Sequence, residues 1–157
     1  MSHVWPALEI GEQELTKDEV LWRQVTKFIW DEEKRVPASN AFGPSTADEG
    51  RPSFSQSGKV TAQESRDWHQ QNARSPSLSV WSVSVFDVLK AKLRVIDDSA
   101  VPVRVGEGKK APGHCYADFR NLTRAERKNA YAILLREALR RGEVKTVDNG
   151  LHHDVAA

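Results

Sequence analysis

The sequence predicts a single α+β domain in which two or three helices pack on a small, mostly antiparallel sheet. Several short runs alternate between apolar and polar residues, which is the pattern of a half-buried strand. The Thr-x-x-Glu sequences at Thr61 and Thr123 are capping boxes, which mark the starts of helices. The 157 residues, 39% hydrophobic and 29% charged, suffice for one core without disulfides or a structural metal.

We divide the chain into three parts, namely an N-terminal arm (1–15), a globular domain (16–145) and a flexible tail (146–157). Early in the domain, the apolar residues between Thr16 and Asp31 fit a helix whose capping box joins Thr16 to Glu19. Leu-Trp-Arg-Gln-Val at 21–25 also alternates as a strand does. Periodicity does not separate the helix from the strand, so both interpretations stay open.

Residues 32–59 are rich in Pro, Gly, Ser and Asn and contain few aliphatic side chains, which predicts a long polar loop. Ala41-Phe42 and Ser53-Phe54-Ser55 are expected to be short anchored or extended pieces within it. Structureless loops longer than about 12–15 residues are uncommon inside compact domains and often carry function. The segment is therefore a candidate binding loop, with a mobile insertion as the alternative.

The rest of the domain is predicted to mix strands with helices. The Thr61 helix should end near Asn72, and the Thr123 helix should reach Arg141, because Gly142 is a natural stop. Between these helices we expect a strand over Leu78–Phe86, a short helix capped by Asp87 and ending at Leu93, a strand at Val95–Ile96, an edge strand containing Pro102 over Val101–Val105, and a strand over Gly113–Phe119.

The last predicted strand carries the candidate catalytic groups. His114, Tyr116 and Asp118 face one way along it, and the three residues that alternate with them face the core. A histidine near a carboxylate suits general acid–base chemistry. His114 and Asp118 lie about 13 Å apart along a straight strand, at about 3.3 Å per residue, so they cannot form a direct hydrogen bond. Each is expected to serve a different point of one pocket or to meet partners from the Ser-rich loop.

Candidates for contact with a ligand or a partner come from several parts of the chain. Arg23 lies between apolar neighbours and could clamp a phosphate or a carboxylate, which also makes it a catalytic candidate. Trp68 could stack on a ligand. The full set of candidate binding residues is Arg23, Ser39, Phe42, Ser53, Ser55, Trp68, His114 and Tyr116.

Composition argues against several kinds of site. Cys115 is the only cysteine, so no intrachain disulfide or cysteine-based zinc cluster can form, and its place on the core face of a strand predicts an inert thiol. The chain has no HExxH, Walker or Gly-x-Gly-x-x-Gly motif, so we predict no metal and no cofactor. The lack of a Gly-x-Ser-x-Gly elbow disfavours a serine hydrolase.

The charge pattern bears on localisation and partners. Lys and Arg (23) nearly balance Asp and Glu (22), so no global field favours nucleic acid or a membrane. Between Arg120 and Lys145, eight Lys and Arg accompany three Glu, so the last helix could lie along phosphates, although we favour a solvated surface there. The chain shows no signal peptide and no run of about 20 apolar residues, which favours a cytoplasmic protein with no membrane partner.

Several motifs together resemble a family of small bacterial proteins of unassigned function. They are Leu-Trp-Arg-Gln-Val at 21–25, Ser-Asn-Ala-Phe at 39–42, the strand near 79–85, and His114 to Phe119 before Leu122-Thr123. The match covers about residues 21–142, and no activity attaches to that family. An early Arg, a middle Ser and a later acidic residue are also distantly similar to ADP-ribosyltransferase-like folds. The chain departs from that pattern, because it has no clear Ser-Thr-Ser strand and no late catalytic Glu on a strand.

These observations lead to three functional hypotheses. The first is a non-catalytic bacterial accessory protein that binds a partner protein or a small polar ligand through the 32–59 loop and the His114 strand face. The second is a transferase or hydrolase acting on NAD or another nucleotide, ADP-ribosyltransferase-like, with Arg23 as the anion clamp and His114 or Asp118 as the acid–base group. The third, less favoured, is nucleic-acid binding through the basic C-terminal helix.

Overall fold

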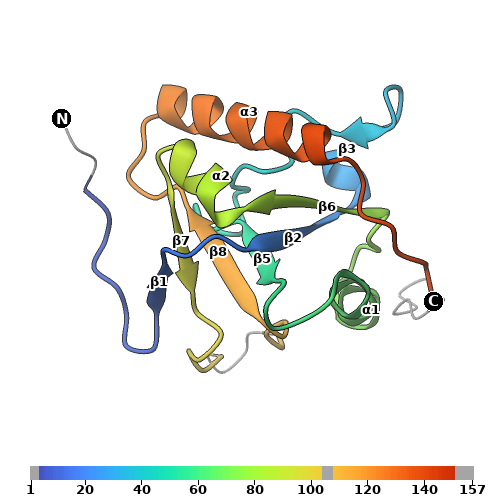
Figure 1. Cartoon of the computed structure of the whole chain (residues 1–157), viewed down its shortest axis with the longest axis horizontal. Coiled ribbons are helices and arrows are strands. Elements are labelled where there is room, and N and C mark those ends of the chain that lie inside the picture. The colour runs from blue at the N-terminus through green and yellow to red at the C-terminus, as the bar shows by residue number, and fades with distance from the viewer. Residues whose placement is uncertain (1–3, 104–107, 151–157) are drawn as a thin grey trace.

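The fold is built on one six-stranded sheet (Figure 1). The computed structural model describes residues 4–103 and 108–150. The strand order is β1-β7-β8-β5-β2-β6, and each neighbouring pair runs antiparallel. The six strands are β1 (Gln13–Leu15), β2 (Val20–Val25), β5 (Ser53–Gln56), β6 (Ser79–Ser84), β7 (Arg94–Asp97) and β8 (His114–Asp118). A separate pair joins β3 (Trp30–Asp31) to β4 (Val36–Pro37).

Three α-helices accompany the sheet in the described part of the chain, and the predicted α+β fold is therefore confirmed. They are α1 (Ala62–Asn72), α2 (Val85–Lys90) and α3 (Arg124–Arg141), with a single 3-10 turn, η1 (Lys27–Ile29), after β2. Each α-helix begins with a capping box, in which a side-chain hydroxyl and the carboxylate three residues later each accept a hydrogen bond from the other residue's amide. Among these helices, none is long and apolar enough to cross a membrane.

The capping boxes at Thr61 and Thr123 confirm the predicted starts of α1 and α3. Gly142 ends α3 with a φ of 82°, a left-handed conformation that favours glycine. The prediction for α2 was wrong in its details. Ser84 is the cap, Asp87 is the acidic partner that bonds back to the Ser84 amide, and the helix stops at Lys90.

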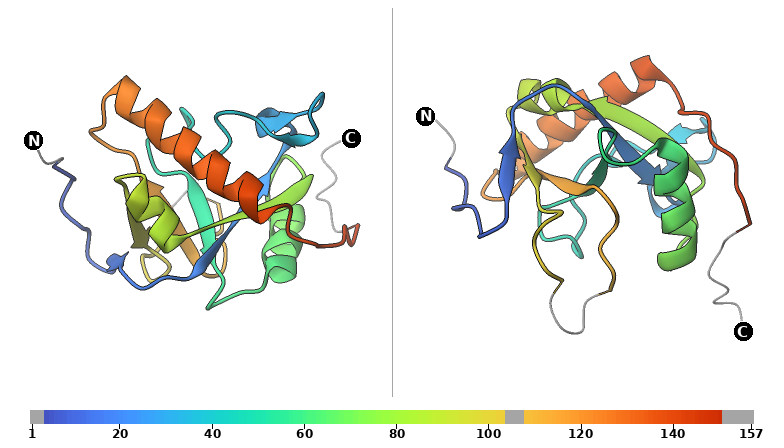
Figure 2. Two further views of the ribbon diagram at one scale, coloured as in Figure 1. Left: turned by 45° about the horizontal axis from the view of Figure 1, so that its top comes forward. Right: turned by 60° about the horizontal axis from the view of Figure 1, so that its bottom comes forward.

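Helices α2 and α3 lie on one face of the sheet, and α1 lies on the other (Figures 1 and 2). The core fills the α3 face, where Leu21 of β2 is buried with Leu134 of α3. Cys115, Ala117 and Phe119, which the sequence assigns to the core face of β8, are each fully buried there. Burial raises the pKa of the Cys115 thiol well above its usual value, which keeps the thiol protonated and unreactive.

The segment from Thr16 to Asp31 contains a strand, and the helix that could begin at Thr16 does not form. Within β2, Leu21 and Val25 are buried on the core face, while Trp22 on the opposite face donates from Nε1 to the carbonyl of Val60 near α1. Both faces of this segment are covered by other parts of the protein. A strand, whose side chains alternate between the two faces, fits this position better than a helix with a single apolar stripe.

Residues 32–59 do not form one continuous polar loop. The segment contains β4, and its Ser53–Gln56 stretch becomes β5, a central strand between β8 and β2. Phe42 is fully buried and stacks on Phe54 of β5, with the ring centroids 6.3 Å apart. The anchored and extended pieces expected at Ala41-Phe42 and at Ser53–Ser55 therefore exist, and they tie the segment to the core.

The edge strand expected at Val101–Val105 is not seen. No strand is assigned to residues 98–103, and Val105 falls outside the described residues. Lys110 reaches into this turn, where its Nζ donates to the carbonyls of Asp98 and Val101 at 2.7 Å each. The side chain of Lys110 thus holds this turn in place without strand pairing.

Both ends of the described chain are attached to the fold. In the arm, Gln13–Leu15 forms β1 and pairs with β7. Beyond α3, the Val144 amide donates to the Val80 carbonyl of β6 at 2.8 Å, and Val147 exchanges two hydrogen bonds with Gln63 of α1. The tail predicted over 146–157 thus begins with residues that lie against α1, whereas its His152-His153 pair lies outside the described residues.

Asp118 is held between two arginines at the end of β8. Its Oδ2 accepts from Arg94 Nε of β7 at 2.8 Å, and its Oδ1 accepts from the backbone amide and the Nε of Arg120 at 3.0 and 2.9 Å. Asp118 has no exposed surface and Arg94 is only 7% exposed. Burial alone would raise the pKa of Asp118, but the bonds from Arg120 and Arg94 hold it below its usual range.

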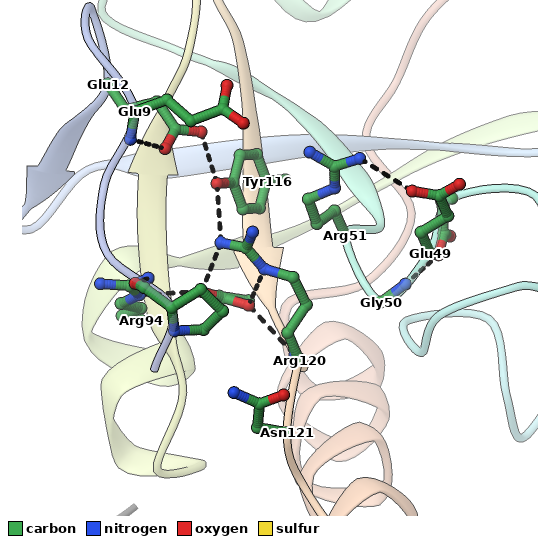
Figure 3. A network of polar contacts seen from close by, with 12 residues as sticks. Glu9, Glu12, Glu49, Gly50, Arg51, Arg94, Tyr116, Arg120 and Asn121 are labelled. Carbon is green, nitrogen blue, oxygen red and sulfur yellow. Dashed lines mark hydrogen bonds and ion pairs between the residues drawn. The ribbon is translucent and has the colours of Figure 1, made fainter. Parts of the chain in front are cut away.

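The same network fixes the N-terminal arm across β7 and β8 (Figure 3). Tyr116 donates from its hydroxyl to Glu12 Oε2 at 2.6 Å, and Arg120 Nη2 donates to that hydroxyl at 3.2 Å. Arg94 Nη2 reaches the carbonyl of Pro6 at 2.7 Å. The charged cluster therefore connects the arm, two strands and the turn that leads to α3.

Replacing Asp118 with Asn is expected to lower the free energy of unfolding by about 3–5 kcal/mol, because Arg94 would stay buried without a negative partner. Urea denaturation at pH 7 measures the loss. Glu49→Gln is the matched control, since it removes one charge from a pair with Arg51 in which the Glu49 side chain is 77% exposed. The control should cost less than about 1 kcal/mol. Equal losses in the two variants would contradict the role given to Asp118.

Candidate functional site

A cavity of about 660 Å³ opens on the α1 side of the sheet. Its floor comes from three strands, namely Trp22 and Gln24 of β2, Ser53 and Ser55 of β5, and His114 and Tyr116 of β8. Side chains two residues apart on a strand share a face, so each strand contributes a pair. Helix α1, the arm and the segments 47–51, 98–103 and 108–111 supply the walls. The volume lies in the range of small-molecule sites, about 300–1,000 Å³.

Most of the candidate residues from the sequence meet in this cavity. The lining includes Arg23, Ser53, Ser55, Trp68, His114 and Tyr116. Three other candidates lie elsewhere. Ser39 borders a separate, shallow hollow beside the β3–β4 pair, Phe42 is fully buried in the core, and Asp118 is fully buried against its arginines. Of the two acid–base candidates on β8, the cavity therefore contains His114 and not Asp118.

Ser53, His114 and Asp98 form a continuous hydrogen-bonded chain along the cavity floor. His114 Nδ1 is 2.5 Å from Asp98 Oδ1, and His114 Nε2 is 2.9 Å from Ser53 Oγ. Because a carboxylate only accepts, the ring proton lies on Nδ1 and faces Asp98. In the neutral ring, Nε2 is then an acceptor for the Ser53 hydroxyl. The side chains of His114 and Asp98 are 18% and 16% exposed, whereas Ser53 is exposed to the cavity.

Strand register brings these three residues together. In the β5–β8 pair, Ser55 lies opposite His114, and Ser53 is its diagonal neighbour on the same face. In the β7–β8 pair, Asp97 lies opposite Cys115, so the residue after Asp97 comes level with His114. The sequence prediction that His114 would meet partners from the Ser-rich loop agrees with this geometry. The partner Asp98 was missed, because its place depends on a pairing between strands that sequence spacing does not reveal.

The turn that carries Asp98 is fixed by its own charges. Asp97 accepts hydrogen bonds from Lys59 Nζ at 2.8 Å and from the amide and hydroxyl of Ser99 at 2.9 and 2.6 Å. Burial alone would raise the pKa of Asp97, but these bonds outweigh it and hold the pKa at about 2. Lys110 Nζ also lies 3.8 Å from Asp98 Oδ2. The Asp98 carboxylate is therefore held in place beside His114.

Arg23 enters the site from the opposite face of β2. Strands β2 and β5 pair only at Leu21 and Trp22, so the Ser53 carbonyl, farther along β5, is available to other donors. Arg23 Nη1 donates to it at 2.9 Å, and Nε donates to the Ala41 carbonyl at 3.0 Å. Burial lowers the pKa of Arg23 to about 10, with Asp48 opposing the shift, so the group is charged at neutral pH. A cation thus lies against the backbone of Ser53.

Helix α1 provides an aromatic wall with a neutral histidine. Trp68 and His69 both line the cavity, and His69 Nε2 is 2.8 Å from the carbonyl of Ser75. Because a carbonyl only accepts, that nitrogen carries the proton. Burial lowers the pKa of His69, with a smaller opposing effect from the bond to Ser75 and further lowering by Arg23 and Arg66. His69 therefore adds no charge to the cavity at neutral pH.

The charges around the cavity nearly balance. Its described lining contains five carboxylates and four lysine or arginine side chains. Several are already paired, including Glu12 with Tyr116 and Asp98 with His114. In the described parts of the chain, no group of three or more His, Cys, Asp or Glu side chains is arranged to hold a metal ion. The arrangement suits a small polar molecule that presents both donors and acceptors.

Comparison of the chain with family models, with curated proteins and with solved structures gave no match.

The His69 imidazole is expected to titrate below pH 6.5 in the folded protein, because burial disfavours its charged form. A proton NMR titration of the ring resonance, assigned by its disappearance in His69→Gln, measures the midpoint. Near pH 6 the unfolded chain binds more protons at this residue than the folded chain, so the contribution of His69 to stability should fall as the pH drops below 6.5. A midpoint at or above 6.5 would contradict the assigned environment.

Proposed function

We propose that the protein is an accessory protein that binds a small polar ligand in the cavity between β2, β5, β8 and α1. The observation that carries the proposal is the convergence in one cavity of Arg23, Ser53, Trp68 and His114, which come from four different elements. Of the partners considered from the sequence, a small ligand fits better than a protein, because the His114 face forms the floor of a hollow.

The lining indicates which chemistry the ligand would present. Trp22 and Trp68 offer ring faces for stacking, and Arg23 supplies a fixed positive charge. Trp22 Nε1 is already bonded to Val60, so its contribution to a ligand would be its apolar surface. A molecule with a planar ring and an anionic group, such as a nucleotide, meets these features together.

Binding of AMP or NAD should change the tryptophan fluorescence of the protein, and the change should depend on Trp68. In Trp68→Ala we expect an affinity weaker by about 5–100-fold, the loss of roughly 1–3 kcal/mol of ring stacking. Trp30→Ala is the matched control, because Trp30 borders the other hollow beside β3 and β4. A titration in which neither probe saturates the wild-type protein, or in which both variants weaken equally, would contradict the proposal.

A second candidate is an NAD- or nucleotide-dependent transferase or hydrolase. It is favoured by one observation, that Arg23 and His114 both hydrogen-bond to Ser53 and therefore lie within reach of a single nucleotide. The general-base role would fall to His114, because Asp118 does not line the cavity.

If this candidate is correct, the protein should release nicotinamide from NAD, as measured by chromatography of the products. His114→Gln should slow the release by about 100-fold or more, the usual contribution of a general acid–base group. Binding of NAD without release of nicotinamide would rule out the enzyme and would leave the binding proposal standing.

The basic helix α3 offers less support for nucleic-acid binding. Near its end, Arg140 pairs with Glu137 and Arg141 pairs with Asp87 of α2, at 2.8 and 3.1 Å. These two arginines serve contacts within the protein, so fewer cations remain for phosphates. Nucleic acid is therefore the least favoured partner of the three considered.

A further inference from the structure

We propose that Ser53, His114 and Asp98 act as nucleophile, general base and orienting carboxylate in the transfer of an acyl group from a small carboxylic ester to water. This inference rests on the proposed function of the cavity as a ligand site, and it assigns a reaction to the groups on the cavity floor. The chain of hydrogen bonds from Asp98 Oδ1 through the His114 ring to Ser53 Oγ has the connectivity that an activated serine requires.

The absence of a Gly-x-Ser-x-Gly elbow disfavours a serine hydrolase only when the sequence is read alone. Catalytic sets of a serine, a histidine and a carboxylate occur on unrelated folds, and they are identified by their geometry and by the role of each group. Here the serine comes from the start of β5, the carboxylate from the turn after β7 and the histidine from the start of β8. The antiparallel register of β5, β8 and β7 brings the three together.

Asp98 and Ser53 are each held by a second contact through the backbone. Asp98 has its backbone carbonyl bonded by Lys110 at 2.7 Å, and the preceding Asp97 is bonded by Lys59. The Ser53 carbonyl is bonded by Arg23. A site with this support keeps its geometry without a ligand, which is what a preorganised catalytic group needs.

Of the three proposed catalytic side chains, only Ser53 is exposed, as a nucleophile has to be. Asp98 and His114 are mostly buried, so the pair is shielded from water, whereas Ser53 is exposed on the cavity floor. The reactive end of the chain is therefore the end that a substrate can reach.

The proposed acyl transfer needs no reactant other than Ser53, His114, Asp98, the ester and water. Ser53 Oγ forms a bond to the ester carbonyl carbon while its proton passes to His114 Nε2, and the resulting imidazolium is stabilised by Asp98. The bond to the alcohol then breaks, and the alcohol leaves with the proton from His114. Water hydrolyses the acyl-serine by the same sequence and restores the hydroxyl. Arg23, which is charged and donates to the Ser53 carbonyl, is the cation that we assign to the negative charge developing on the substrate oxygen.

The test uses a fluorophosphonate probe, which forms a bond between Ser53 Oγ and phosphorus as fluoride leaves. Intact mass and peptide mapping should place one adduct on Ser53, and p-nitrophenyl acetate should be hydrolysed. Ser53→Ala should abolish the adduct and lower hydrolysis by at least about 100-fold. Ser57→Ala is the control, because Ser57 directly follows β5 and does not line the cavity. Its adduct should form as in the wild type.

Asp98→Asn tests the orienting role. It should slow labelling by roughly 10²–10⁴-fold by favouring the wrong tautomer of His114, while circular dichroism shows an intact fold. An adduct that survives in Ser53→Ala, an adduct on another residue, or no adduct in the wild-type protein would overturn the inference. Titration of the wild-type protein with AMP tests the ligand proposal separately. Failure of AMP to bind would reject that proposal, whereas an adduct confined to Ser53 would still support the nucleophile.

Discussion

The carboxylate of Asp118, buried between Arg94 and Arg120, is the interaction on which the arrangement of the fold depends. It joins β7 to β8 at one end of their ladder and fixes the turn that leads into α3. The other end of the same ladder sets Asp98 beside His114. A shift of one residue in this register would send side chains to the opposite face. Asp118 and its two arginines therefore help to position the cavity floor, although they do not line the cavity themselves.

The polar groups around Asp118 can be buried because they form hydrogen bonds to one another. The carboxylate of Asp118 accepts from both arginines, and Arg120 also bonds to the Tyr116 hydroxyl. Burial and the bond to Glu12 raise the pKa of Tyr116, so the phenol keeps its proton and continues to donate to Glu12. The arm is thus attached by a donor that does not titrate in the physiological range.

The parts of the structure that could be predicted from the sequence are those governed by local chemistry. The capping boxes of α1 and α3 and the alternation along β8 depend on residues a few positions apart, and the structure matches them. The Thr16–Asp31 segment stayed ambiguous, because a strand covered on both faces and a helix can share one apolar pattern.

Only part of the candidate site could be predicted, because the local sequence pattern does not show which distant strands pair. His114 and Ser53 could be proposed from residue type and strand face, and both lie in the cavity. Phe42 was a candidate binding residue and also part of an expected anchored piece; it is fully buried and does not line the cavity, which agrees with the anchored piece. Asp98 was missed, because its relation to His114 arises only when β7 and β8 pair. Contacts that depend on the pairing of distant segments cannot be predicted from the local sequence pattern.

The bridge between Val144 and Val80 has a consequence for solubility. Strand β6 is an outer strand of the sheet, and an outer strand presents backbone groups to which another polypeptide can add. Val144 occupies one of these positions, and the chain then continues to α1, where Val147 bonds to Gln63. At the other edge, β1 has only three residues. The segment after α3 thus works as a guard against edge-to-edge association between copies, and a chain shortened at Gly142 would be expected to self-associate.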